Sequence, residues 1–218
     1  MTMSPLKKVA LGAALLASGV AAHAVTLLSE GFNSVPALAG SGWVLTNEST
    51  PAGSTPGFFQ GDANIFAAQS GAANSYAAAN YNSAAAGGLI RSWLITPTFS
   101  TADEVTVSFW ARGAADPGYF DTIAYGFSTS GSASTGSFVL NSATVVGGTW
   151  SQYTVTLAGR GAGSTARFGI EYLGAADFSN YVGIDTLTVT AVPEPTTWLL
   201  FGAGLLGVAA RRRNLGAR

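Results

Sequence analysis

The sequence predicts an all-β fold, a jelly-roll or lectin-like antiparallel β-sandwich between two apolar end segments. Three observations predict it. Apolar and polar side chains alternate along many short stretches, no stretch between the two ends has a helical period, and Gly, Asn and Ser gather between the stretches. Period-two alternation is typical of half-buried antiparallel strands. About ten such strands in one domain imply two packed sheets.

The N-terminal segment, residues 1–24, has the pattern of a secretory signal peptide. Two lysines precede an apolar run, and the small residues Ala22 and Ala24 occupy the two positions that signal peptidase recognises. We therefore expect the mature chain to begin at Val25. The apolar run is shorter than the roughly 20 residues that a membrane-spanning helix needs, which favours cleavage over an uncleaved anchor.

The region 25–192 is predicted to be the sandwich domain. Val105, Val107 and Phe109, for example, alternate with polar neighbours. The same pattern predicts strands at 27–32, 43–46, 64–68, 89–95, 105–110, 122–127, 138–146, 153–157, 167–172 and 181–190. Residues 67–88 are rich in Ala, Ser, Asn and Gly, so we expect a loop with one or two marginal strands there, because small side chains bury little area.

The C-terminal segment, residues 193–218, has three parts in order. A Pro-Glu-Pro turn precedes a short apolar stretch, 198–210, and a basic end follows it; the residues of the turn and the end are Pro193, Glu194, Pro195, Arg211, Arg212 and Arg213. The prolines keep the glutamate extended, the apolar stretch can enter a bilayer as a short transmembrane segment, and the arginines hold its end on the cytoplasmic side.

This arrangement strongly resembles the PEP-CTERM sorting signal of Gram-negative bacteria. The resemblance implies recognition by an exosortase, cleavage near Pro-Glu-Pro, and delivery to the cell surface or the extracellular polymer. Contact with the membrane would then be transient and made only through residues 198–210.

Composition excludes several classes of function. The 218 residues include no Cys and one His, and 10% of them are charged. Without Cys there is no disulfide scaffold, thiol nucleophile or Cys-based zinc site. The one histidine, His23, precedes the expected mature chain, which removes Ser-His-Asp catalysis and His-ligated metals. Residues 25–192 hold four Arg, no Lys and ten acidic residues, a net charge of −6, so nucleic acid and anionic lipid are poor partners.

Seven segments of the domain follow one another in a recognisable order. They are LSEGF at 28–32, GW at 42–43, SWLITP at 92–97, VSFWAR at 107–112, FSTSG at 127–131, TW at 149–150 and VGIDTLTV at 182–189. Together they resemble the choice-of-anchor J domain, which is related to MAM-like and cleaved-adhesin domains. The resemblance implies a lectin-like jelly roll used for adhesion or binding. Asp185-Thr186 stands where an Asp-Asp pair is frequent in the wider group.

Asp185 is also singled out by physical chemistry. In a regular strand its side chain shares a face with Leu187 and Val189, and an inward carboxylate needs a partner. Three arrangements stay open: a structural calcium ion, an Arg pair or hydrogen-bonded turn, and a bulge that exposes the side chain. The calcium ligands would be Glu30, Asp185 and one or both of Asp62 and Asn64, and the arginine would be Arg91 or Arg167.

Aromatic side chains indicate a carbohydrate-binding surface as one alternative. Tyr119 and Phe120 lie in the loop between Asp116 and Asp121 and are the best candidates for exposed rings that stack on sugars. An enzyme would need a nucleophile or two carboxylates about 5 to 10 Å apart. The sequence has no E-x-D-x-x-E, G-x-S-x-G, P-loop or zinc motif, and Asp-Pro-Gly is first of all a turn.

These observations favour a secreted, non-enzymatic protein of the cell surface or extracellular matrix, active in adhesion or biofilm structure. The alternative is a carbohydrate-binding module for exopolysaccharide, and a glycan hydrolase comes third. The expected partners are signal peptidase and exosortase during export, then polysaccharide or other surface proteins. The only cofactor that the sequence suggests is a structural calcium ion.

Overall fold

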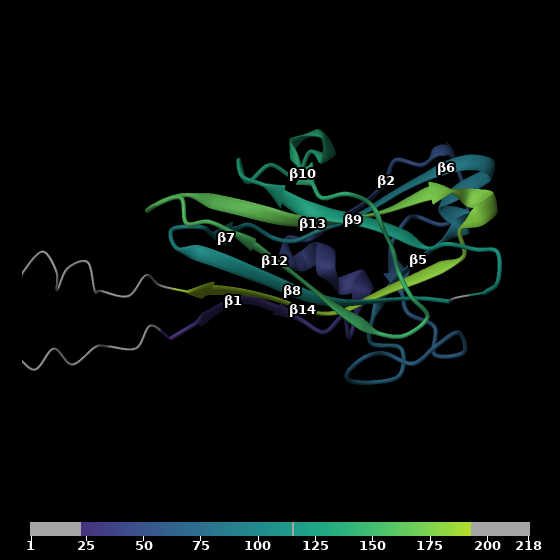
Figure 1. Cartoon of the computed structure of the whole chain (residues 1–218), viewed down its shortest axis with the longest axis horizontal. Coiled ribbons are helices and arrows are strands. Elements are labelled where there is room, and N and C mark those ends of the chain that lie inside the picture. Colours follow the sequence, from purple (N-terminus) through teal and green to yellow (C-terminus); the bar gives the residue numbers. More distant parts are fainter. Residues whose placement is uncertain (1–22, 115, 193–218) are drawn as a thin grey trace, which may run out of the picture. The chain divides into compact units, whose positions relative to one another are not determined.

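Two antiparallel sheets lie face to face in the computed structural model, which describes residues 23–114 and 116–192 (Figure 1). The predicted antiparallel β-sandwich is confirmed. The predictions for Ala22, the Pro-Glu-Pro turn, the segment 198–210 and the three arginines fall outside these residues and stay predictions. Within the part described, no helix is long and apolar enough to cross a membrane. Residues 23–193 pack as a unit of their own.

The first sheet has six strands, with the long strand β14 (Tyr181–Val192) near its centre. β14 pairs with β8 on one side, and on the other side it pairs with β5 and then with β1. The order is β12 (Ser151–Leu157), β8 (Glu104–Gly113), β14, β5 (Ala77–Asn80) and β4 (Phe59–Gln60), with β1 (Val25–Glu30) beside the far half of β14.

The second sheet has eight strands, of which β9, β13 and β6 are the long ones. The order is β10 (Val139–Leu140), β9 (Thr122–Ser128), β13 (Thr165–Ala175), β6 (Ala84–Ile95) and β2 (Val44–Asn47), with β11 (Thr144–Val145) on β9, β3 (Thr50–Ala52) on β6 and β7 (Phe99–Ser100) on β13. In the part of the chain described, the helices are four short 3-10 turns: η1 (Val35–Ser41), η2 (Tyr81–Ser83), η3 (Thr135–Ser137) and η4 (Ala176–Phe178).

The main core fills the space between the sheets with the apolar half of each alternating pattern. Phe109 of β8, Phe168 of β13 and Ile184 of β14 are all fully buried there. The rings of Phe109 and Phe168 lie 5.7 Å apart. Because the ion pairs among the described residues are those of Arg91 with Glu48 and Glu171, burial of this apolar area, at roughly 25 cal/mol per Å², is the main source of stability.

A second, smaller cluster covers the outer face of the six-stranded sheet. Phe66 and Tyr76, from the loop before β5, stack with ring centroids 5.0 Å apart against Tyr181. The guanidinium of Arg112 lies 4.4 Å from the centre of the Phe66 ring. Trp150 packs partly buried on this cluster and donates its indole N–H to Ala67 O at 2.9 Å.

Three sequence predictions differ from the structure. Residues 64–68 form no strand. Phe66 is buried by packing in the second aromatic cluster, and its segment pairs with no neighbouring strand. The alanine-rich segment is not marginal either. Ala77, Ala78 and Ala79 of β5 are fully buried, because β5 lies between β14 and β4, Ala77 and Ala79 face the main core, and Ala78 faces the second aromatic cluster. The predicted strand 138–146 splits into β10 and β11, which both pair with β9.

Candidate functional site

A cleft of about 590 Å³ opens at the end of the sandwich where the β8–β9 loop meets the connection from β13 to β14. This is the right-hand end in Figure 1, opposite the end where β14 finishes at Val192. The lining residues come from separate segments of the chain: Tyr81, Asn82, Ala84, Ala86, Asp116, Tyr119, Ala176, Asp177, Ser179 and Asn180.

The β8–β9 loop presents the aromatic side of the cleft. The backbone N–H of Tyr119 donates to Asp116 O at 3.2 Å, and Gly118 between them has φ 90°, a value that glycine adopts without strain. The Asp-Pro-Gly turn predicted from the sequence therefore raises the next two rings into solvent. Tyr119 is 46% exposed and lines the cleft, while Phe120 is 59% exposed beside it.

Asp121 anchors this loop from below. It is only 4% exposed, and its Oδ1 accepts hydrogen bonds from the Tyr172 hydroxyl at 2.7 Å and from the Asn180 backbone N–H at 2.9 Å. Its Oδ2 accepts one from Ala114 N–H at 3.3 Å. Burial, reinforced by the negative charge of Asp121, holds the pKa of the Tyr172 phenol well above its usual range. Asp121 is thus a positioning residue that does not line the cleft.

The opposite wall consists of η2 and η4 and is tied to the same loop. Phe120 N–H donates to Phe178 O at 2.7 Å, and Tyr81 N–H donates to Asn180 O at 2.9 Å. The Asn180 side chain donates to Asp116 Oδ2. These bonds fix the two walls relative to each other before any ligand arrives, which lowers the entropic cost of binding.

The arrangement suits a hydroxylated ligand. Tyr81 and Tyr119, each 46% exposed, offer ring faces, and the amides and carboxylates around them offer donors and acceptors. Sequence analysis identified Tyr119 and Phe120 but missed Tyr81, Asp177 and Asn180. No signal in the sequence pointed to these residues, because alternation identifies the faces of strands and gives no information on which loops meet.

Asp185 does not belong to this cleft. It is fully buried, and its Oδ2 accepts hydrogen bonds from the backbone N–H groups of Gln69 at 2.8 Å and Ser70 at 3.1 Å. Its Oδ1 accepts one from Thr186 N–H at 2.6 Å. Burial raises the pKa of this carboxyl, and the three N–H groups oppose that shift. The structure shows Asp185 in a hydrogen-bonded turn at a bulge of β14, and the bulge leaves the side chain buried.

The other predicted calcium ligands make local contacts. Glu30 Oε1 accepts a hydrogen bond from Phe32 N–H at 2.7 Å, and Asp62 Oδ1 accepts two from the backbone and side chain of Asn64 at 2.8 and 2.9 Å. Across residues 23–114 and 116–192, no three His, Asp or Glu side chains gather in a group that could hold a metal ion. The donor set of the described residues does not fit a shared ion, and calcium binding itself is left to a thermal unfolding measurement.

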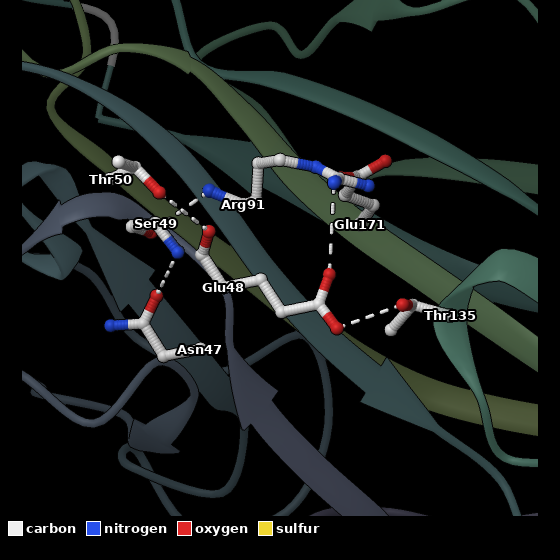
Figure 2. A network of polar contacts seen from close by, with 7 residues as sticks. All are labelled: Asn47, Glu48, Ser49, Thr50, Arg91, Thr135 and Glu171. Atoms are coloured by element: carbon white, nitrogen blue, oxygen red, sulfur yellow. Dashed lines mark hydrogen bonds and ion pairs between the residues drawn. The ribbon is translucent and has the colours of Figure 1, made fainter.

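Neither arginine considered as a partner of Asp185 contacts it. Arg91 lies on the outer face of the eight-stranded sheet, where its Nε donates to Glu171 Oε1 at 2.8 Å and its Nη1 lies 3.7 Å from Glu48 Oε2. Figure 2 shows Glu48 between Arg91 and Thr135, whose hydroxyl donates to the other glutamate oxygen at 2.8 Å. Arg167 donates to three backbone carbonyls instead.

Comparison with known proteins identifies the C-terminal part of the chain. Residues 191–213 match the PEP-CTERM protein-sorting motif. The chain carries a PEP-CTERM sorting motif. This match confirms the resemblance found in the sequence, while no curated protein matches the chain.

The sandwich is similar to solved adhesin domains. The K1 cleaved adhesin domain of Lys-gingipain from Porphyromonas gingivalis W83 aligns with a TM-score of 0.58 and 19% identity, over 78% of this chain and 100% of that one. The K3 domain of the same protein gives 0.53 and 19%, over 77% and 99%. TmCBM61, solved with beta-1,4-galactotriose, gives 0.45 and 12%, over 73% and 97%. At these identities the two adhesin domains show the fold of this chain and no more.

Proposed function

We propose that this chain is an exported, non-enzymatic adhesion protein of the bacterial surface or extracellular matrix, and that it binds extracellular polysaccharide through the cleft between Tyr81 and Tyr119. The observation that carries the proposal is the cleft, which sets two half-exposed rings among amide and carboxylate groups on a hydrogen-bonded frame. Sugar rings have apolar faces that stack on such rings and hydroxyl edges that pair with such polar groups.

The sorting motif supports the location. It implies exosortase-dependent sorting. The proposal adds export through signal peptidase and a membrane contact made only through the segment 198–210 before processing. β14 leads from the cleft end at Tyr181 to Val192, where the matched motif begins, and its 12 residues span about 36 Å at ~3.3 Å per residue. The cleft therefore opens at the end of the sandwich far from the point where the chain continues into the motif.

The burial of one of the two carboxylates at the ends of the β8–β9 loop favours a binding role over hydrolysis. Of the two that bracket the β8–β9 loop, Asp121 is buried and occupied by three hydrogen bonds. A glycan hydrolase needs two carboxylates that reach the scissile bond. Asp116 and Asp177 both line the cleft, so turnover of a glycan that Asp116→Asn or Asp177→Asn abolishes would contradict a binding-only role. We expect oligosaccharides incubated with the protein to remain intact.

The test is binding of residues 23–193 to immobilised chitosan, chitin, cellulose and alginate. Tyr81→Ala and Tyr119→Ala should each weaken binding to the retained polymer by about three- to tenfold, the usual worth of one aromatic contact. Val139→Ala is the matched control, because Val139 is 82% exposed on β10 and does not line the cleft. Retention on no polymer, or equal retention of all variants, would refute the proposal.

A further inference from the structure

The charges that line the cleft are all of one sign. Asp116 and Asp177 are acidic, and none of the other lining residues is Lys, Arg or His. Asp116 Oδ2 accepts from the Asn180 side chain, and Asp177 Oδ1 accepts from Gly87 N–H at 2.9 Å. Within the residues described, the second oxygen of each carboxylate has no hydrogen-bond or ion-pair partner, so both carboxylates retain acceptor capacity.

The other acidic side chains of this part of the chain that face a hollow or the interior are already matched. A shallower hollow of about 340 Å³ on the eight-stranded sheet contains Glu171, but Arg91 binds that carboxylate. Asp121 and Asp185 are buried and receive three N–H or O–H groups each, or more. Among the described residues, the cleft thus combines two carboxylates with a ligand-sized space whose lining contains no Lys, Arg or His.

The frame keeps these carboxylates at the cleft. Asn180 holds Asp116 through its side chain while its own backbone is held by Asp121, and Gly87 holds Asp177. A ligand that stacks on the tyrosine rings thus meets carboxylates that are already in place. Charge-assisted hydrogen bonds from an ammonium group to a carboxylate are about twice as strong as neutral ones.

We propose that the cleft selects polysaccharides with free amino groups, that is, polymers of a hexosamine whose amines are not acetylated. This inference rests on the proposed function and names the ligand class of the same site. A uronic acid polymer carries the same sign of charge as the cleft and as the whole domain, whose net charge is −6 over residues 25–192, and is repelled. An N-acetylated polymer has the same sugar ring faces but carries a neutral amide in place of the ammonium group.

The experiment compares two oligosaccharides that differ only in acetylation. Isothermal titration of residues 23–193 at low salt should show a chitosan hexamer binding at least about tenfold more tightly than the fully acetylated chitin hexamer, with the difference shrinking as salt screens the charges. Asp116→Asn and Asp177→Asn should each reduce the difference, because the amide keeps the shape and removes the charge. Glu104→Gln is the matched control: it removes one exposed charge beside Val192, far from the cleft.

The outcomes separate the inference from the proposed function. Equal affinity for the two hexamers, or loss of the preference in Glu104→Gln as well, would overturn the selection of amines and leave glycan binding intact. Binding to neither hexamer and to no polymer of the panel would refute the proposed function itself. Preference for the chitosan hexamer that disappears only in the two cleft variants supports the inference.

Discussion

Asp185 lies where the neighbour of β14 changes. β5 pairs with β14 as far as Ile184, and β1 pairs with it from Leu187 onward, so the two residues between them have no strand on that side. The N–H groups of Gln69 and Ser70 point at the carboxylate there instead. The neighbouring residue, Thr186, has φ 47°, which non-glycine residues rarely adopt. One side chain thus closes a gap in the sheet.

Replacing Asp185 tests this role. Asp185→Asn would turn an NH2 group toward N–H donors that now meet an oxygen, which costs about 1–3 kcal/mol for a buried unsatisfied group. For a domain of this size we expect the thermal midpoint to fall by roughly 2–4 °C for each kcal/mol. Thermal unfolding followed by circular dichroism measures it, with Glu104→Gln as an exposed control. An unchanged midpoint would mean that the loop does not depend on this carboxylate.

Calcium is tested with the same measurement. Because the oxygens of Asp185 already accept backbone hydrogen bonds, we expect the unfolding midpoint of the unmutated protein to be the same in EDTA and in excess calcium. An ion that binds the folded state would raise the midpoint by mass action. A rise that Glu30→Gln or Asp185→Asn abolishes would establish the predicted calcium site in spite of these hydrogen bonds.

At the scale of elements, the short strand β10 depends on a glycine of its neighbour. A Cβ atom at Gly126 of β9 would lie 1.9 Å from the carbonyl oxygen of Val139, which is backbone and cannot turn away. Gly169 of β13 likewise leaves room for Phe138, whose ring packs on Trp93 at 5.5 Å. Glycines inside these strands therefore mark where the segment after η3 approaches the sheet.

Gly126→Ala should displace β10 from β9 and destabilise the domain by about 1–3 kcal/mol, the usual cost of overpacking. Hydrogen exchange of the Val139 and Leu140 amides, together with the unfolding midpoint, measures both effects. Gly136→Ala is the matched control, since a Cβ atom at Gly136 would meet nothing within 4 Å. If both variants show the same unfolding midpoint and the same hydrogen exchange, the close approach of β10 to β9 does not contribute to stability.

The elements that the sequence predicted correctly share one physical cause. β8, β9, β12, β13 and β14 each turn alternate residues toward the main core over much of their length, and that alternation is visible in the residues themselves, although other segments also cover much of the second face of β9 and β13. β5 escaped prediction because three consecutive alanines contain no alternation, although two of them face the main core and Ala78 faces the second cluster. Their burial depends on tertiary contacts, with the main core for Ala77 and Ala79 and with the aromatic loop for Ala78.

At the scale of the whole molecule, the cleft also depends on tertiary contacts that no local sequence pattern predicts. Asp-Pro-Gly predicted a turn with exposed rings at Tyr119 and Phe120, and that local inference was correct. Tyr81 lies 38 positions earlier in the sequence, and Asp177 and Asn180 lie about 60 positions later, so only the topology of the two sheets brings them together. A site assembled from loops at one end of a sandwich cannot be read from any single segment of it.

The stability of the whole domain should fall in alkali because of its buried phenols. Tyr172 and Tyr76 are fully buried, and burial, helped by Asp121 and Tyr181 respectively, raises the pKa of each phenol far above the ordinary value of 10.0. The folded protein therefore keeps two protons that the unfolded chain releases above about pH 10. The stability that these phenols contribute is complete below that pH and declines above it, by up to about 1.4 kcal/mol per pH unit for each phenol.

Thermal unfolding between about pH 9 and pH 12, recorded together with tyrosinate absorbance, tests this expectation. The unfolding midpoint should stay constant up to about pH 10 and then fall steeply as the pH rises. Tyrosinate from the buried rings should appear only as the protein unfolds, because the folded state excludes the phenolate from its low-dielectric core. Tyr172→Phe should make the fall shallower, since one of the two retained protons is gone. Tyrosinate that forms from all rings before unfolding begins would show that these phenols are open to solvent and would contradict the packing around Asp121.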